Sequence, residues 1–276
     1  MRDVSARDGI ANAVILATEF TNMPTRSALH DALKGARVLF VGLASFDGRP
    51  KAALYSLDLL FQTDFSVPLR RNNEWYDFLS EVDEPLTFEG DQTNLTGELG
   101  DPLSIITRLR LELDPGEWEA VGPFMEIAML AQPGDVWQPF NLSGSLLVRG
   151  LAAARHIGMP KEYVSMHDET QDLIDDIADK LPLTLEVKDS RMVACWAGDD
   201  DIGPTLRRLS NEDYDSYFVE FAVGTNREIK PFVDWRINSQ MNEGAGGLHL
   251  ALGDGLTGAH IDFIGPHVRC VQGPQD

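Results

Sequence analysis

Hydrophobic positions in residues 1–84 predict a small segment of mixed helix and strand. Apolar residues recur at helical spacing from Ile10 to Ala17, which predicts a helix within about the first 30 residues. Residues 27–34 predict a second, short helix, and residues 37–42 form an apolar run of strand length. Because a strand–helix–strand unit needs about 30 residues, this segment is too short for a complete doubly wound domain.

From residue 85 onward the pattern is that of a β-rich domain. Apolar and polar residues alternate over residues 103–113, which favours strands there. Residues 183–193 are typical of a hairpin with Asp189 and Ser190 at the turn. Helices are expected over two stretches, residues 169–180 and 202–209.

These patterns together predict the fold class and its division. We expect an α/β to α+β fold with a reduced N-terminal α/β segment, residues 1–84, and a β-rich domain, residues 85–276. Hydrophobic residues make up 43% of the 276 residues, so the chain can bury a sizeable core and is not mainly disordered.

Charge narrows the classes of partner. Lys and Arg total 23 against 44 Asp and Glu, which gives a formal net charge of −21. A chain this acidic repels phosphate groups, so we expect no nucleic-acid partner and no anionic membrane. The same charge favours cationic ligands, metal ions or basic peptide segments, although much of it is expected to be a solvated surface.

Cysteine content and the N-terminus indicate a cytoplasmic protein. The two cysteines, Cys195 and Cys270, form no disulfide framework and no Cys-x-x-Cys motif, so a reducing compartment is expected. The N-terminus lacks the apolar core and cleavage site of a signal peptide. No uninterrupted apolar run reaches the roughly 18 residues of a membrane span.

Candidate chemistry gathers near the C-terminus. His260 and Asp262 lie two residues apart, so on a strand they point to the same face, about 7 Å apart along the chain. His249 belongs to an alternating apolar run that predicts the preceding strand. Two imidazoles and a carboxylate suffice to hold Fe(II), Mn(II) or Zn(II). A histidine that hydrogen-bonds an aspartate for purely structural reasons would show the same spacing.

Three blocks in this region resemble a known group of metalloproteins. Residues 220–226 (EFAVGTN), 248–253 (LHLALG) and 260–262 (HID) are similar to the aminopeptidase T family and to the 2,5-dihydroxypyridine dioxygenases that share its fold. The likeness extends more weakly upstream, through residues 133–150 and 185–193.

The resemblance implies metal-ligand roles for Glu220, His249, His260 and Asp262, and it places Asp135 where the peptidases carry a ligand glutamate. The dioxygenase-like branch needs only the two histidines and Asp262, around Fe(II). Asp135 is one methylene shorter than glutamate, which retracts its carboxylate from a metal site. The expected cofactor is therefore one divalent transition metal (Fe, Zn, Mn or Co) or none.

Short members of this group, the peptide-binding proteins of crocagin-type natural-product pathways, look like the closer analogue. The leading hypothesis is a peptide-binding protein in peptide tailoring or natural-product biosynthesis, in which an extended peptide adds to a sheet edge. The alternative is an active metal-dependent enzyme, either an aminopeptidase or a non-haem Fe(II) dioxygenase with a His/His/Asp site. The resemblance also implies a homodimer.

Overall fold

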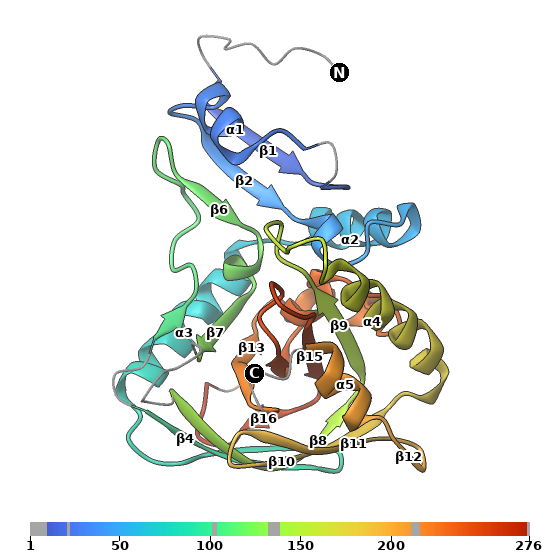
Figure 1. Ribbon diagram of the computed structural model, residues 1–276. Helices are drawn as coiled ribbons and strands as arrows, with labels where there is room; N and C mark the ends of the chain where they lie inside the picture. The colour runs from blue at the N-terminus through green and yellow to red at the C-terminus, as the bar shows by residue number, and fades with distance from the viewer. Residues whose placement is uncertain (1–9, 21–22, 101–103, 132–138, 211–215, 275–276) are drawn as a thin grey trace.

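Two antiparallel β-sheets packed face to face form the centre of the molecule, and a smaller parallel sheet stands above them (Figure 1). This computed structural model describes residues 10–20, 23–100, 104–131, 139–210 and 216–274. The fold is mixed α/β and rich in strands, which confirms the predicted class.

The first large sheet has the strand order β12-β11-β10-β8-β4-β3-β16. Buried and exposed residues alternate along β4 and β10, so one face packs on the core and the other meets solvent. The predicted hairpin is confirmed, and Asp189 and Ser190 at its turn both have positive φ (51° and 56°). The strands are β3 (Leu86–Gly90), β4 (Thr93–Leu99), β8 (Phe140–Val148), β10 (Leu183–Lys188), β11 (Arg191–Ala197), β12 (Asp200–Asp201) and β16 (Arg269–Cys270).

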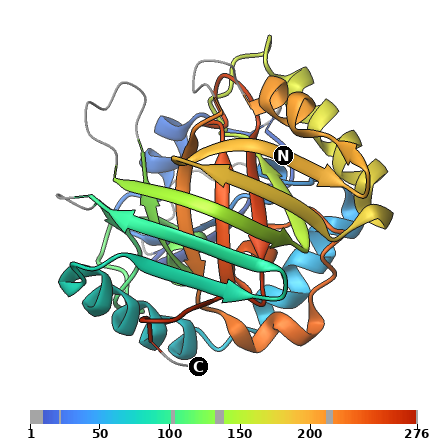
Figure 2. The ribbon, with the colours of Figure 1, turned by 90° about the horizontal axis from the view of Figure 1, so that it is seen from below.

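The second large sheet has the order β5-β7-β13-β14-β15-β9, and its strands run across those of the first sheet (Figure 2). Its inner face contributes Ile127, Phe221, Leu250 and Phe263 to the main core. All residues of β14 are buried, so the outer face of this sheet is covered as well. The strands are β5 (Ile105–Ile106), β7 (Glu126–Leu130), β9 (Gly150–Ala154), β13 (Phe218–Gly224), β14 (Gly247–Leu252) and β15 (His260–Gly265).

The small sheet is parallel and consists of β1 (Asn12–Leu16), β2 (Arg37–Val41) and β6 (Trp118–Ala120). Helix α1 (Arg26–Ala32) connects β1 to β2. The helix and strand predicted here at residues 27–34 and 37–42 are confirmed within a residue or two at each end. The helix predicted around Ile10–Ala17 is wrong, because this segment pairs in register with β2 and its β-branched residues suit a strand.

Helices cover the margins of the sheets. Helix α3 packs along β7 on one side, and α4 and α5 pack together on the other side, near β9 and β11 (Figure 1). The predicted helices at residues 169–180 and 202–209 correspond to α4, with the short helix that follows it, and to α5. The α-helices are α2 (Pro50–Gln62), α3 (Ser66–Glu81), α4 (Val164–Ile177), α5 (Gly203–Ser210) and α6 (Gln240–Gly244), and the short 3-10 helices are η1 (Leu43–Ser45), η2 (Gly122–Phe124), η3 (Ala178–Lys180) and η5 (Arg227–Phe232).

The segment at residues 103–113 differs from the strands predicted for it. Among its described residues only Ile105–Ile106 form a strand. Further along, the carbonyl of Arg108 accepts a hydrogen bond from the buried Asn72 side chain, and the Arg108 guanidinium pairs with Glu117. These side-chain contacts hold the backbone in an irregular path, which the alternating pattern did not reveal.

Elements that precede and follow the predicted boundary at residue 84 pack in the same core and pair in the same sheet. Trp75 and Leu79 of α3 belong to the same core as the large sheets, and β2 pairs with β6. The division into two domains stays a prediction. Among the described residues, no helix has both the length and the apolar character needed to cross a membrane.

Candidate metal and ligand site

The outer face of the six-stranded sheet carries the polar residues of the site. On β15, Ile261 and Phe263 point into the core between the sheets, so His260 and Asp262 point to the opposite face. The same alternation turns Glu220 outward beside the core residue Phe221 on β13. A strand period of two residues therefore places these groups on one face, as the sequence predicts for His260 and Asp262.

Strand register brings the two carboxylates of this face together. Ala251 on β14 lies directly opposite Glu220 on β13 and opposite Asp262 on β15. Neighbouring strands are about 4.8 Å apart, so a larger side chain at position 251 would fill the space between the carboxylates. The methyl group of Ala251 leaves that space open.

Three of the predicted ligand residues meet at one point, and His249 lies beside them. His260 Nε2 lies 3.3 Å from Glu220 Oε2 and 3.4 Å from Asp262 Oδ1. One ligand atom from each of these three residues lies within 4.8 Å of the other two. His249, which is only 1% exposed, contacts the other oxygen of Glu220 at 3.5 Å through Nε2. The structure therefore joins all four predicted residues, with His249 in contact with the triad through Glu220.

Two further acidic residues, absent from the sequence prediction, complete the cluster. Glu126 on β7 lies 3.7 Å from His249, measured between Oε2 and Nε2, and Glu243 enters from α6. A lone carboxylate in the apolar run of β7 is a signal that could have identified Glu126. Glu243 carries no such signal, because only the packing of α6 against β13 and β15 brings it there. The weaker candidate, Asp135, lies outside the described residues.

Burial and mutual contact shift the pKa values of the three glutamates in different directions. Burial works to raise the pKa of Glu220, but hydrogen bonds from His249 and His260 outweigh it and hold that pKa well below its usual range. Burial, with the negative charges of Glu220 and Asp262, raises the pKa of Glu126 to about 7. Burial and the nearby carboxylates Asp262 and Glu126 raise the pKa of Glu243 well above its usual value.

Nearby carboxylates raise the pKa values of both histidines above the ordinary value. Burial works against the charged ring of His249, yet its contacts with Glu220 and Glu126 raise the pKa. The pKa of His260 is raised well above its usual value, because Asp262 and Glu220 outweigh the cost of burial. The cluster thus combines four carboxyl groups with two imidazoles, and the carboxylates around the two rings are what raises the pKa values of the histidines.

A backbone contact fixes which nitrogen of His260 faces the carboxylates. Its Nδ1 lies 2.8 Å from the carbonyl of Gly253, which can only accept, so Nδ1 carries the donated hydrogen and Nε2 points to the site. Gly253 has a φ of +77°, and a Cβ there would lie 2.2 Å from the carbonyl oxygen of Ala259. The turn after β14 therefore requires glycine at this position.

A cleft of about 410 Å³ opens above the cluster. Glu126, Glu220, Glu243, His260 and Asp262 lie at its base. Its walls come from the small sheet, the β9 end and α6, and include Phe40, Ala120, Arg155, His156 and Gln240. The acidic cluster therefore faces an accessible space between the small sheet and the six-stranded sheet.

The chain is similar to known proteins along most of its length. A family model described as crocagin biosynthetic protein CgnE/B matches residues 3–272. The chain belongs to this family. The resemblance to crocagin-type proteins is thereby confirmed, and the protein is a biosynthetic protein of the CgnE/B family. No curated protein matches the sequence.

Two solved structures are similar to this CgnE/B-family protein. One is the 2,5-dihydroxypyridine dioxygenase from Pseudomonas putida KT2440, at 13% identity and a TM-score of 0.46, with 90% of this chain and 65% of that chain covered. The other is wild-type AmpT from Thermus thermophilus, at 13% identity and a TM-score of 0.48, with 93% of this chain and 70% of that chain covered. The chain thus spans less than two thirds of the dioxygenase's length.

The donor set of the CgnE/B-family protein fits a divalent metal ion. Ligands at about 2.0–2.2 Å from a tetrahedral ion lie about 3.3–3.6 Å from one another. The separations from His260 Nε2 to Glu220 and Asp262 are 3.3 and 3.4 Å. In the described part of the chain, the buried Oδ2 of Asp262 has no hydrogen-bond partner. The three residues therefore form a candidate Glu/His/Asp metal-binding triad.

Proposed function

We propose that this CgnE/B-family protein binds a peptide in the acidic cleft, as a step in peptide tailoring or natural-product biosynthesis. The observation that carries the proposal is a 410 Å³ cleft whose base is formed by the carboxylate cluster. Membership in a family named for crocagin biosynthesis supports the biosynthetic context.

The charge of the cleft selects the group that enters it. Glu220 stays ionised, because its pKa is held low. Carboxylates that converge on one point in a partly desolvated site attract a primary ammonium group more strongly than a neutral one. We infer that the peptide's free α-amino group, or a lysine side chain, is the part that reaches the base of the cleft.

The small sheet offers main-chain partners for the rest of the peptide. Within the described residues, β6 pairs only with β2, so its outer edge has no neighbouring strand, and Ala120 of β6 lines the cleft. An extended peptide that adds to such an edge gains main-chain hydrogen bonds that do not depend on its sequence. Specificity then depends on the side-chain contacts of the cleft.

Peptide titration tests this function. We expect the amide of Ala-Ala-Phe-Ala-Ala with a free amino terminus to bind in the presence of a chelator, and its N-acetyl form to bind about tenfold more weakly. Glu220→Gln is expected to lower the affinity for the free-amine peptide by a similar factor. Glu98→Gln, at an exposed position on β4, is the matched control and should keep that affinity. Equal affinities for the two peptides, or no binding of either, would contradict the proposal.

A metal-dependent enzyme is the second candidate, and the Glu220–His260–Asp262 triad favours it. A bound divalent ion would polarise a carbonyl group or lower the pKa of its water. His260 would present Nε2, which its bond to Gly253 orients. Glu126, with a pKa near neutral, would take or give a proton beside His249. Aminopeptidase and Fe(II) dioxygenase activities both remain proposals.

Metal analysis distinguishes the two candidates. If the site holds metal, the purified protein should retain Fe, Mn, Co or Zn after reconstitution, and His260→Ala should release it. His156→Ala removes an imidazole from the same cleft without touching the triad, so this variant should keep its metal. Less than about 0.1 equivalent of any of the four metals after their addition would eliminate the metal-dependent enzyme, and peptide binding would be the one candidate left.

A further inference from the structure

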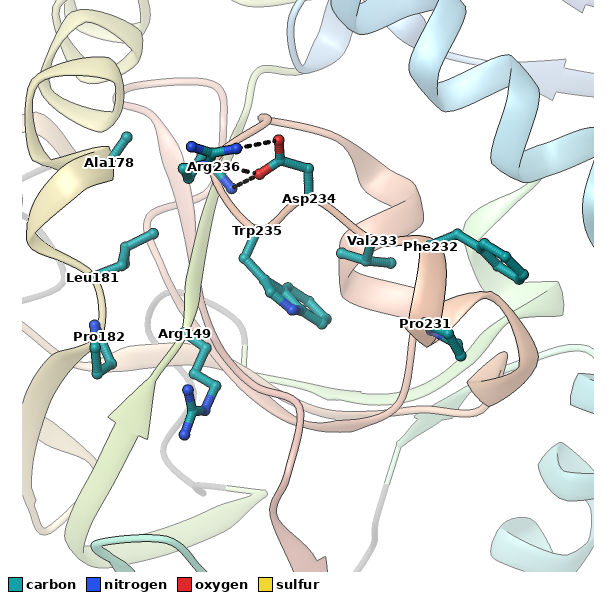
Figure 3. Close-up of a pocket in the computed structure, with 10 residues that line it drawn as sticks. All are labelled: Arg149, Ala178, Leu181, Pro182, Pro231, Phe232, Val233, Asp234, Trp235 and Arg236. Atoms are coloured by element: carbon teal, nitrogen blue, oxygen red, sulfur yellow. Dashed lines mark hydrogen bonds and ion pairs between the residues drawn. The ribbon is translucent and has the colours of Figure 1, made fainter.

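A second hollow, separate from the acidic cleft, lies beside η5 (Figure 3). Its volume is about 470 Å³, and no residue lines both sites. Residues 231–236 form one part of it, the segment from η3 to Pro182 forms another, and Arg149 between β8 and β9 completes it. We call this hollow the Trp235 groove.

Apolar side chains line much of the Trp235 groove, and its central indole is closely packed. Figure 3 shows Trp235 between Leu181 and Pro182 on one side and Pro231 and Val233 on the other. A Cβ on residue 150 would lie 3.1 Å from Trp235 Cε3, so the indole packs closely on the backbone of this glycine. Proline rings and a packed indole lose little conformational freedom on binding, which favours a docking role.

The groove also differs in charge from the rest of this acidic chain. Its lining contains two guanidinium groups, Arg149 and Arg236, and one carboxylate, Asp234, which pairs with Arg236 at 2.9 Å. Arg149 contacts Asp91 at 3.4 Å, but the Asp91 side chain is 73% exposed. An ion pair so exposed is weak, so Arg149 can exchange Asp91 for another carboxylate at little cost.

The backbone of Arg149 is held in place while its side chain remains accessible. Its amide donates to the carbonyl of Ile264 at 2.8 Å, and its side chain is 35% exposed. A guanidinium on a fixed backbone beside an apolar floor can bind a carboxylate through two parallel hydrogen bonds. The groove thus offers an apolar surface and an accessible guanidinium group side by side.

We propose that the Trp235 groove docks an extended peptide segment in which a proline or aromatic residue adjoins acidic residues. Grooves lined by aromatic residues bind extended, proline-containing segments. Arg149 supplies the charge complementarity for a neighbouring carboxylate, whereas Arg236 is paired with Asp234. This preference is opposite to that of the acidic cleft, so the two sites would take different segments and the groove does not depend on the function of the cleft.

Two blocked peptides test the groove. The probes are Ac-Ala-Pro-Phe-Glu-Glu-Ala-amide and the same peptide with lysines in place of the glutamates, measured by calorimetry. We expect the glutamate peptide to bind at least about tenfold more tightly. Arg149→Gln should remove most of that difference. Arg269→Gln is the matched control, because Arg269 makes a similar surface pair with Glu89 at 3.5 Å and does not line the groove.

Tryptophan fluorescence locates the bound peptide. Binding of the glutamate peptide should change the indole emission, and Trp235→Phe should abolish the change. Trp196→Phe on β11, where the indole is also partly exposed at 36%, should preserve it. An equal loss of affinity in Arg149→Gln and Arg269→Gln, or no saturable binding up to about 1 mM, would overturn the proposal.

One further variant separates this inference from the proposed function. Glu220→Gln changes the cleft but not the groove, so it should keep full affinity for the blocked glutamate peptide. If the free-amine peptide fails while the blocked peptide binds, the cleft proposal falls and the groove stands. A loss of groove binding in Glu220→Gln would count against a separate site.

Discussion

Single buried polar side chains, each with an unusual environment, define the chemistry of this CgnE/B-family protein. Asp262 and His249 are both 1% exposed, and Glu243 is 6% exposed. Burying such groups costs free energy unless they are paired or neutralised. Here they compensate one another in part, because His249 contacts Glu220 and Glu126, and because the pKa of Glu243 is raised beside Asp262 and Glu126.

A buried histidine outside the cluster predicts acid sensitivity. His167 is 5% exposed, and burial followed by the charge of Arg155 lowers its pKa. His167 binds a proton more tightly in the unfolded chain, where its pKa is about 6.5, than in the folded chain. The stability of the fold with neutral His167 is therefore fully present above that pH and is lost as the pH falls.

His167→Gln should therefore flatten the decline of the unfolding free energy between about pH 7 and pH 5, as followed by urea denaturation. A glutamine amide can still donate to the carbonyl of Phe46, which His167 Nε2 contacts at 3.2 Å. His156→Gln, at an exposed position, is the control. Identical pH slopes for wild type and His167→Gln would show that His167 does not contribute.

At the scale of elements, the β10–β11 hairpin has its own side-chain anchor. Ser190 is fully buried, and its hydroxyl accepts from the amide of Leu142 at 2.8 Å and lies 3.2 Å from the carbonyl of Phe140. The turn residue therefore ties the hairpin to β8, the neighbouring strand in the sheet.

Ser190→Ala should lower the unfolding free energy by about 1–3 kcal/mol, because the Leu142 amide would be left without its acceptor. Asp189→Gly changes the exposed turn position, where relief of a positive φ is offset by added freedom of the unfolded chain, so we expect a change within about 0.5 kcal/mol. Chemical denaturation of both variants measures the difference, and equal effects would contradict the anchor.

Element prediction succeeded where local pattern and tertiary environment agree. The 183–193 hairpin has alternating residues on a sheet with one wet face, so its period is visible in the sequence. The helix predicted where β1 lies is wrong because an apolar stretch of a few residues fits either a helix or a strand. Pairing with β2 makes this stretch a strand. The strand predicted at residues 107–113 is wrong because side-chain contacts hold this segment in an irregular path. Asn72 and Asn73 bind its backbone carbonyls, and Glu117 pairs with the Arg108 side chain.

At the scale of the whole molecule, a net charge of −21 produces a field that attracts cations toward the cleft. The Debye screening length falls from about 10 Å at 0.1 M salt to about 3 Å at 1 M salt. The affinity of the free-amine peptide should therefore fall by about three- to tenfold across this range. Calorimetry at both salt concentrations measures it, and an affinity that does not depend on salt would contradict recognition by charge.

The blocked glutamate peptide provides the contrast in the same experiment. Salt weakens its pairing with Arg149 but also screens its repulsion by the rest of the chain, so its affinity should change less. A steeper decline for this peptide than for the free-amine peptide would mean that the groove is not surrounded by net negative charge.

The sequence alone determined the acidic character, the strand period and the most informative part of the site. His260 and Asp262 share a face because side chains on a strand alternate, and this relation holds wherever the strand lies. His249 was a candidate because an alternating run predicts the strand before His260, whereas Glu220 was found through a resemblance carried by short blocks of sequence. These blocks fold into the adjacent strands β13, β14 and β15.

Only the tertiary structure decided the rest. Strand order and register place Ala251 between Glu220 and Asp262. The packing of α6 brings Glu243 to the cluster, and residues of the small sheet form part of the cleft wall. The Trp235 groove likewise joins three segments far apart in the chain. Local periodicity carries no information about such meetings, because they depend on which surfaces the core buries together and not on the spacing of residues along one element.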